Sequence, residues 1–322
     1  MPNLMTHKIF ADDVLKVSSS KILDYVSKNP QAFSVGSSGP DFLFYYGQIP
    51  GQDKEVAKRV VNIGSLIHAY NINDWHKVAI ESIISEKDEK LKATMISFFI
   101  GHITHWALDA KTHPFIFYRS DGSSEESKYW HYRYESMLDT VMVNEYKKTS
   151  IKAYPSKEIL KTDKHIRAAI YQVYKDAVEK VFEIDFKKDY VDQAFKDCDK
   201  ALNFLYDPSG IKFKLIKFFE TLINKKWQYS SHIVFDKVDK DADVLNLNNH
   251  QWKNPAKPSF VSNESFLDLY YKAIDLSLKA LNEFVLVLEG KPIDDFLKVI
   301  NNRSYETGLS YHAEMVEYKS IY

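Results

Sequence analysis

The sequence predicts an all-α protein, a multi-helix bundle with a helical C-terminal extension. Glycine and proline are scarce, at 10 each among 322 residues, which disfavours a turn-rich β architecture. Apolar residues recur three and four positions apart through most of the chain, as expected for helices that bury one face. We find no internal repeat and no long alternating pattern of the kind that marks exposed strands.

Composition excludes several classes of protein. The 43 basic and 44 acidic residues give a formal net charge of -1, so there is no strong electrostatic signal for nucleic-acid binding. The single cysteine, Cys198, excludes an intrachain disulfide framework and a cysteine-rich zinc module. The chain start lacks a basic segment followed by an apolar run, and no apolar stretch is long enough to span a membrane. We therefore expect a cytoplasmic protein, and the oligomeric state stays open.

The first third of the chain predicts short helices around an irregular loop. His7 stands at the front of an apolar segment with helical spacing. A loop rich in glycine and proline then carries Asp41 among several aromatic residues. A helix from about Lys54 has His68 near its end. On the next helix His76 falls off the apolar stripe, so we expect its side chain to be exposed.

The region of the chain from residue 102 to residue 135 holds the strongest chemical signal. Here His105 is followed four residues later by Asp109, and His131 four residues later by Glu135. Residues four apart lie on one face of a helix, so each pair can present two ligands to one point. The apolar stripe that precedes His105 continues into these positions, which predicts that they are buried.

Buried imidazole and carboxylate groups are costly unless they are paired or bound to metal. Together they form the ligand set of zinc and related divalent ions, so the pattern indicates a metal site inside the bundle. The alternative is a few core histidines combined with surface ion pairs. His113, between the two pairs, precedes Pro114, and this predicts that the helix ends there.

The C-terminal half predicts further amphipathic helices over residues 157–183, 189–206 and 211–226. Residues 228–262 are polar and broken, which indicates a long surface loop. Ser262 or Asn263 is expected to cap the helix that follows. We divide the chain into a metal-binding helical domain over residues 1–150 and a helical extension over residues 151–322.

Several familiar catalytic patterns are absent from the sequence. There is no HExxH helix of a metalloprotease, no phosphate-cradling P-loop and no dinucleotide fingerprint. No histidine follows an acidic residue by three positions, which excludes the Glu-x-x-His pairs of di-iron bundles. A GxSxG nucleophile elbow is also missing.

Eight residues in a fixed order make the chain resemble the bacterial zinc-dependent phospholipase C family, which is related to P1-type nucleases. The resemblance covers roughly residues 5–146 and includes the segments THKIFA, GPDFLFY, GSLIHAYN, GHITHWALDAKTHP and HYRYE. The ligand order of that family is His, Asp, His, HxxxD, His, HxxxE. The matching residues are His7, Asp41, His68, His105, Asp109, His113, His131 and Glu135.

This resemblance implies an all-α fold with two or three zinc ions held by those eight residues. It implies a phosphodiesterase of the phospholipase C type, in which a zinc-bound hydroxide attacks the phosphorus of a phosphoester such as a phospholipid. Asp41 is the residue expected to orient or deprotonate the attacking water. Two alternatives stay open: a nuclease or nucleotide phosphatase of the P1 type, and a non-catalytic protein whose metal is structural or supports an interaction.

The chain departs from the family at two places. Secreted members use the amino group of an N-terminal tryptophan as a zinc ligand, whereas here Met1 stands six residues before His7. The segment from Asp109 to His113 is also shorter than in the secreted members. We therefore expect a site near His7 that is incomplete, weaker or differently ligated, and a different substrate geometry.

Overall fold

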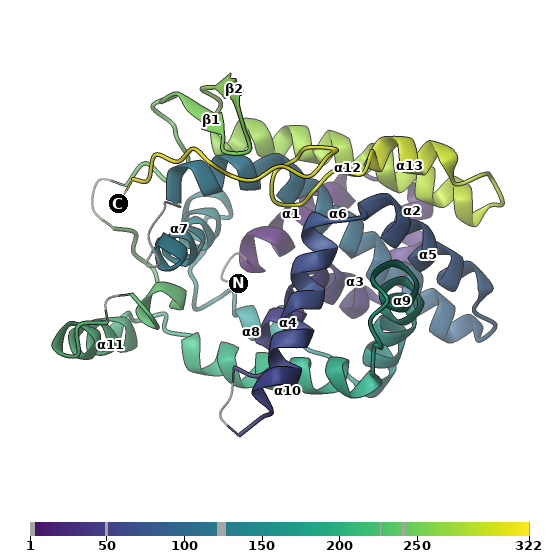
Figure 1. Ribbon diagram of the computed structural model, residues 1–322, viewed down its shortest axis with the longest axis horizontal. Coiled ribbons are helices and arrows are strands. Elements are labelled where there is room, and N and C mark those ends of the chain that lie inside the picture. Colours follow the sequence, from purple (N-terminus) through teal and green to yellow (C-terminus); the bar gives the residue numbers. More distant parts are fainter. Residues whose placement is uncertain (1–3, 49–50, 121–126, 226, 240–241, 322) are drawn as a thin grey trace.

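The computed structural model describes residues 4–48, 51–120, 127–225, 227–239 and 242–321. Within these ranges the regular structure is helical apart from one two-stranded antiparallel sheet, which confirms the predicted all-α class (Figure 1). The α-helices are α1 (Leu4–Lys16), α2 (Ser20–Ser27), α3 (Pro30–Gly36), α4 (Lys54–Ala69), α5 (Ile72–Ser85), α6 (Glu89–Ser120), α7 (Ser127–Val141), α8 (Ser156–Ile159), α9 (Lys164–Phe182), α10 (Lys188–Leu205), α11 (Ile211–Leu222), α12 (Phe266–Leu288) and α13 (Asp294–Ile300). Shorter elements are the 3-10 helices η1 (Gly39–Tyr45) and η3 (Ser230–His232), the π-helix η2 (Met142–Tyr146), and the strands β1 (Trp252–Asn254) and β2 (Lys257–Ser262).

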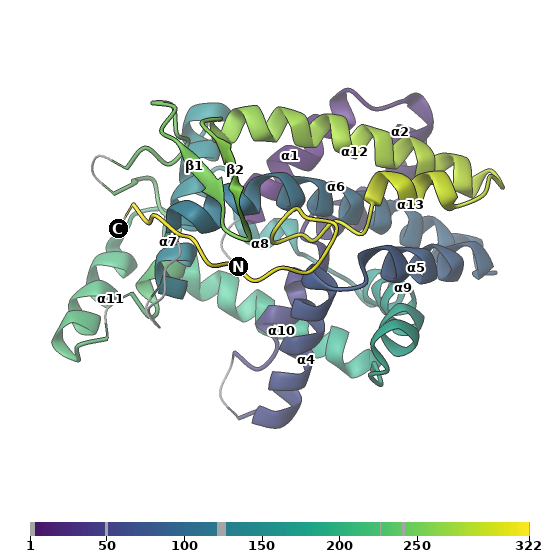
Figure 2. The same ribbon diagram turned by 45° about the horizontal axis from the view of Figure 1, so that its top comes forward.

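Helix α6 runs through the middle of the molecule, with α12 along one side and α3 along another (Figures 1 and 2). Its side chains are buried almost all round from Thr94 onward, as expected for a central helix. Two glycines let α3 approach it closely. A Cβ atom on Gly36 would lie 2.0 Å from the carbonyl oxygen of Phe98, and one on Gly101 would lie 2.3 Å from that of Phe33. Because α3 lies so close to α6, the element that follows it, η1, also packs against α6.

Helix α6 does not end before Pro114, so the predicted boundary there is wrong. The helix continues to Ser120 and keeps His113 on the same face as His105 and Asp109. Proline removes the hydrogen bond to the carbonyl group four residues earlier, which belongs to Ala110. A Cβ on Gly308 would lie 2.4 Å from that carbonyl oxygen. Close packing by the C-terminal segment therefore covers the helix where its own bonding is interrupted.

The C-terminal half packs onto the N-terminal half. Helix α12 lies along α6 and α1, and residues from both sides of position 150 share one hydrophobic core. The division at residue 150 stays a prediction. The N-cap of α12 is Ser265, which forms a capping box with Asp268, so the predicted caps Ser262 and Asn263 are wrong.

The described residues between 228 and 262, which leave out 240 and 241, contain more regular structure and are more buried than the predicted surface loop. It contains η3 and the β1–β2 hairpin. Trp252 on β1 is buried, and its ring meets the Phe115 ring of α6 edge to face at 5.6 Å. Two strands of three and six residues are too short to show an alternating pattern in the sequence.

Two side-chain orientations differ from what helical spacing suggests. His76 is fully buried, so its predicted exposure is wrong: it lies between Trp75, Phe99 and Phe296, where α5 meets α6 and α13. On α11 the apolar stripe that includes Leu215 and Phe218 faces outward. No described helix is long and apolar enough to cross a bilayer.

Candidate metal centre

Helix α6 contributes three side chains to one polar cluster in the interior. His105, Asp109 and His113 follow one another at intervals of four residues, and all are buried. The Nε2 atom of His105 lies 2.9 Å from one carboxylate oxygen of Asp109, and that of His113 lies 3.4 Å from the other. Asp109 therefore faces a different imidazole with each oxygen, which is the arrangement a bridging carboxylate needs.

Helix η1 and helix α4 add Asp41 and His68 on one side of this row. An oxygen of Asp41 lies 3.1 Å from Nε2 of His68 and 3.6 Å from Nε2 of His105. Gly39 makes this approach feasible: it has a φ of +51°, and a Cβ there would lie 2.2 Å from Cδ2 of His105. The glycine-rich loop is thus ordered around the His105 ring.

Helix α1 brings His7 to the other face of Asp109. Its Nε2 atom lies 3.1 Å from Asp109 Oδ1, and its ring stacks on His105 at 4.2 Å between centroids. The buried carboxylate of Asp139 holds the start of this helix: it accepts bonds from the Thr6 hydroxyl at 2.7 Å and the Thr6 N–H at 2.8 Å. Asp139 therefore caps α1 from α7.

Helix α7 completes the cluster with His131 and Glu135. An oxygen of Glu135 lies 3.3 Å from Nε2 of His131 and 3.5 Å from Nε2 of His113. Since His113 also faces Asp109, it joins the α7 pair to the rest of the site.

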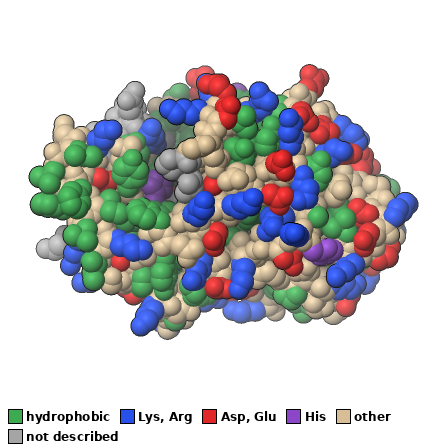
Figure 3. Space-filling view, turned by 90° about the horizontal axis from the view of Figure 1, so that it is seen from below, with side chains coloured by type: hydrophobic (Ala, Val, Ile, Leu, Met, Phe, Trp, Pro, Cys, Tyr) green, Lys and Arg blue, Asp and Glu red, His purple; other side chains and the backbone are tan. Residues whose placement is uncertain are grey.

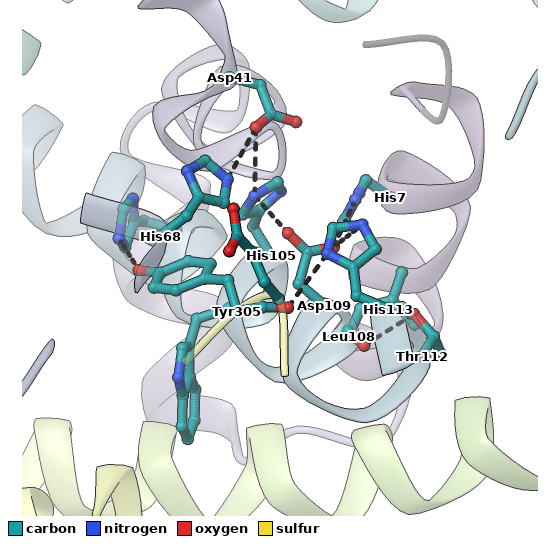
Figure 4. Close-up of polar contacts among 12 residues, drawn as sticks. His7, Asp41, His68, His105, Leu108, Asp109, Thr112, His113 and Tyr305 are labelled. Atoms are coloured by element: carbon teal, nitrogen blue, oxygen red, sulfur yellow. Dashed lines mark hydrogen bonds and ion pairs between the residues drawn. The ribbon is translucent and has the colours of Figure 1, made fainter. Parts of the chain in front are cut away.

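All eight residues singled out in the sequence lie in one connected set of contacts, drawn from five elements. Figure 4 shows six of them: His7, Asp41, His68, His105, Asp109 and His113. Two trios bring ligand atoms within 4.8 Å of one another: His7, His105 and Asp109, and Asp41, His68 and His105. Their assignment as metal ligands stays a prediction. Met1 lies outside the described residues, so the expectation about the ligands near His7 stays a prediction.

Neighbouring groups orient the histidines so that Nε2 points into the cluster. Nδ1 of His68 lies 2.7 Å from the Gly64 carbonyl oxygen, and Nδ1 of His113 lies 3.0 Å from that of Tyr305. A carbonyl oxygen only accepts, so both Nδ1 atoms donate, and in the neutral ring Nε2 carries the lone pair. Such contacts fix the tautomer and the ring orientation of a metal-binding histidine.

The cluster is strongly polarised by its carboxylates. Burial lowers the pKa of His113, but Asp109 and Glu135 outweigh this and raise it to about 9. Burial acts in the opposite sense on Asp109, yet the imidazoles of His105, His113 and His7 hold its pKa well below the usual range. The imidazoles of His131 and His113 likewise outweigh burial and hold the pKa of Glu135 below its usual range. Asp109 and Glu135 are thus ionised, and they would present negative charge to a cation.

Several buried polar atoms of the cluster make no hydrogen bond within the described part of the chain. Those that face other members of the cluster are Nε2 of His105 and His113 and both carboxylate oxygens of Asp109 and Glu135; Nδ1 of His7 and of His105 is also without a hydrogen bond. The ion-pair distances above are short, but their geometry does not give hydrogen bonds to these atoms. Leaving so many buried polar atoms unpaired is costly, and coordination to a divalent cation would satisfy them together. The residues therefore fit zinc.

Tyr305 lies beside the cluster and was not identified from the sequence. Its ring is 5.0 Å from His68, and its hydroxyl lies 2.9 Å from Nε2 of His102. It arrives from the C-terminal segment, about two hundred residues from the histidines it contacts. No local pattern marks such a residue. Two aromatic residues near Asp41 differ in their surroundings. Phe42 belongs to the hydrophobic core and stacks on Phe195, whereas Phe44 is half-buried and lies beside His68.

Comparison with known families gives one match, to zinc dependent phospholipase C, over residues 6–184. No curated protein and no solved structure matches the chain. The match covers more than half of the 322 residues, includes every residue of the buried cluster, and stops before α10. This chain belongs to the zinc-dependent phospholipase C family.

Proposed function

We propose that this protein hydrolyses a phosphodiester with the help of two or three zinc ions held in the buried cluster. The observation that carries the proposal is the continuous contact between five imidazole Nε2 atoms and three carboxylates in a water-poor interior. Bound zinc supplies Lewis acidity, which lowers the pKa of water and neutralises charge on phosphoryl oxygens.

The number of donor groups argues for more than one ion. Eight residues exceed the four ligands of a tetrahedral site. A ring nitrogen has a single lone pair, so His105 Nε2 serves only one ion even though it belongs to both trios. Asp109 has two oxygens that face different histidines, so it is our candidate for the shared ligand.

Asp41 is our candidate for the residue that orients or deprotonates the attacking water. It comes from η1 rather than from the row on α6, and it contacts only His68 and His105 among the charged groups of the site. Its side chain keeps some exposure, 8%, whereas that of Asp109 has none. A partly accessible carboxylate beside the ligands is suited to handling the proton of a water molecule.

A panel of substrates tests the proposal. Zinc-loaded protein is assayed against a soluble chromogenic phosphodiester, the matching phosphomonoester, phospholipid vesicles and single-stranded oligonucleotides. We expect turnover of the diester and the phospholipid. Preference for the oligonucleotide or the monoester would favour the nuclease or phosphatase alternative. No turnover by fully loaded protein would contradict catalysis and favour a structural metal.

A further inference from the structure

Helix α11 exposes an apolar face that no other part of the described chain covers. Its outward side chains are between 55% and 65% exposed. We refer to this set as the α11 face: Ile211, Leu215, Phe218, Phe219, Leu222 and Ile223. In Figure 3 hydrophobic side chains gather at the left end of the molecule, where Figure 1 places α11. Contiguous exposed apolar groups of this size mark a binding surface.

The opposite face of α11 anchors the helix, so the exposed face is not a product of loose packing. Phe213 joins a small separate core with Ile233 and Phe235. The buried Glu220 accepts hydrogen bonds from the N–H groups of Tyr229 and Ser230. The helix is therefore held from inside while its apolar stripe points to solvent, the reverse of the usual amphipathic arrangement.

The charges around the α11 face favour an anionic surface. Residues 211–225 contain four lysines and one acidic residue, the inward-facing Glu220, in a chain whose net charge is -1. Lys214 and Lys225 are exposed and form no ion pair with a described residue. Lys212 lies along the helix at the other margin, where it donates to carbonyl oxygens at the end of α10. A helix with aromatic and aliphatic residues on one face and lysines at its margins suits the interface of an anionic membrane.

Helix α11 also lies close to the metal-binding helix α7 (Figures 1 and 2). The buried guanidinium of Arg133 on α7 stacks over Phe213 at 5.0 Å and over Phe235 at 5.1 Å. Arg133 stands two residues after His131 and two before Glu135. The core beneath α11 thus rests on the helix that supplies two of the candidate ligands.

We propose that α11 docks this protein on an anionic phospholipid surface, with its apolar face at the acyl boundary and its marginal lysines at the headgroups. Lipid binding by the α11 face does not rest on the proposed function. Helix α11 lies at the edge of the molecule, where it can reach a lipid interface (Figure 1).

Flotation of the full chain with vesicles tests the docking. We expect binding to phosphatidylcholine vesicles to strengthen when phosphatidylserine is added. Phe218→Ser combined with Leu222→Ser should weaken binding at least about tenfold, because two large side chains no longer leave water. The matched control, Val17→Ser with Ile84→Ser, changes two exposed apolar residues elsewhere and should bind as wild type. Lys214→Glu with Lys225→Glu should abolish the preference for phosphatidylserine.

The outcomes separate docking from catalysis. Phe218→Ser/Leu222→Ser should keep turnover of the soluble diester, and Glu135→Gln should lose turnover while still binding vesicles. Wild-type protein that binds neither kind of vesicle, or serine variants that bind as wild type, would overturn the docking proposal. Concentration-dependent dimers that the serine variants abolish, without vesicle binding, would instead assign the face to a second copy of the chain. Vesicle binding without any phosphoester turnover would overturn only the proposed function.

Discussion

Two groups of buried histidines lie side by side in this protein, and only one of them faces carboxylates. His105 and His113 on α6 point at Asp109, with Glu135 beyond. His76 and His102 lie one turn away, stacked among aromatic rings, with centroids 5.6 Å apart. Burial alone therefore does not distinguish a candidate ligand from a core histidine. The two groups differ in whether a buried carboxylate lies at Nε2.

The two groups also differ in charge. Asp109 and Glu135 outweigh burial and raise the pKa of His113 to about 9, so this imidazole holds a proton until a cation displaces it. Burial without any carboxylate lowers the pKa of His76 to about 4, and its ring is neutral. His102 is neutral for the same reason, with tyrosine hydroxyls of Tyr174 and Tyr305 at its two nitrogens.

The largest effect is expected from removing the shared carboxylate. Asp109→Ala removes the carboxylate that three imidazoles share, so it should abolish most zinc binding and destabilise the fold by about 3 to 5 kcal/mol. The measurements are zinc per chain and thermal unfolding with and without added zinc. His250→Ala is the control because its side chain is exposed. Equal losses in both variants would contradict the central place of Asp109.

Asp41→Asn tests whether Asp41 acts on the attacking water or only helps to bind zinc. The amide keeps the shape of the side chain, so the fold and much of the zinc should remain. Phosphodiester turnover should fall by at least about a hundredfold, the low end of general acid–base contributions. His131→Ala should instead lose zinc and turnover together. If Asp41→Asn retains wild-type turnover with its zinc, Asp41 is only a structural neighbour of His68.

The pH dependence of stability tests whether His76, in the group without carboxylates, is neutral in the folded chain. The pKa of His76 is about 4 in the folded chain and near 6.5 when unfolded, so the unfolded state binds more protons between these values. Stability should therefore fall as the pH drops below 6.5, by about 2 kcal/mol at pH 5. Denaturant unfolding of wild type and His76→Leu across this pH range isolates the contribution of His76 to stability, because the groups of the cluster titrate equally in both proteins. Parallel pH curves for the two proteins would show that His76 is not protonated on unfolding in this range.

The smallest effect concerns Tyr305, whose ring lies near His105 and whose hydroxyl contacts His102. Tyr305→Phe removes the partner of His102 Nε2 and should cost about 1 kcal/mol. Zinc content should not change, because His113 is oriented by the backbone carbonyl of Tyr305 rather than by its side chain. Differential scanning calorimetry and elemental analysis check both parts. A loss of zinc in this variant would mean that the hydroxyl supports the site directly.

Much of the cluster that faces carboxylates could be predicted from the sequence, because residues four positions apart lie on the same face of a helix. That rule placed Asp109 beside His105 and Glu135 beside His131. Asp41 has no such local signal and was identified by its order among the family's ligands. His76 was misassigned because helical spacing describes a single buried face, whereas α5 is covered from more than one side by Phe99 and Phe296.

Other errors arose where tertiary contacts outweigh local preference. Pro114 disfavours a helix locally, but α6 is packed on all sides and continues. Phe218 and Leu222 follow a helical stripe, yet spacing does not say whether a stripe faces the core or solvent. Tyr305 could not be found from the sequence, since only the fold brings residue 305 to the histidines of α4 and α6.

Elemental analysis of the purified protein tests the central claim most directly. The chain is reconstituted with zinc, freed of excess ion and measured beside a His250→Ala control and an Asp109→Ala variant. Wild type and control should each hold more than one zinc ion, because eight donors in one connected cluster exceed the four of a single tetrahedral site. Less than about one zinc ion per wild-type chain, below even a single four-ligand site, would contradict a multinuclear centre.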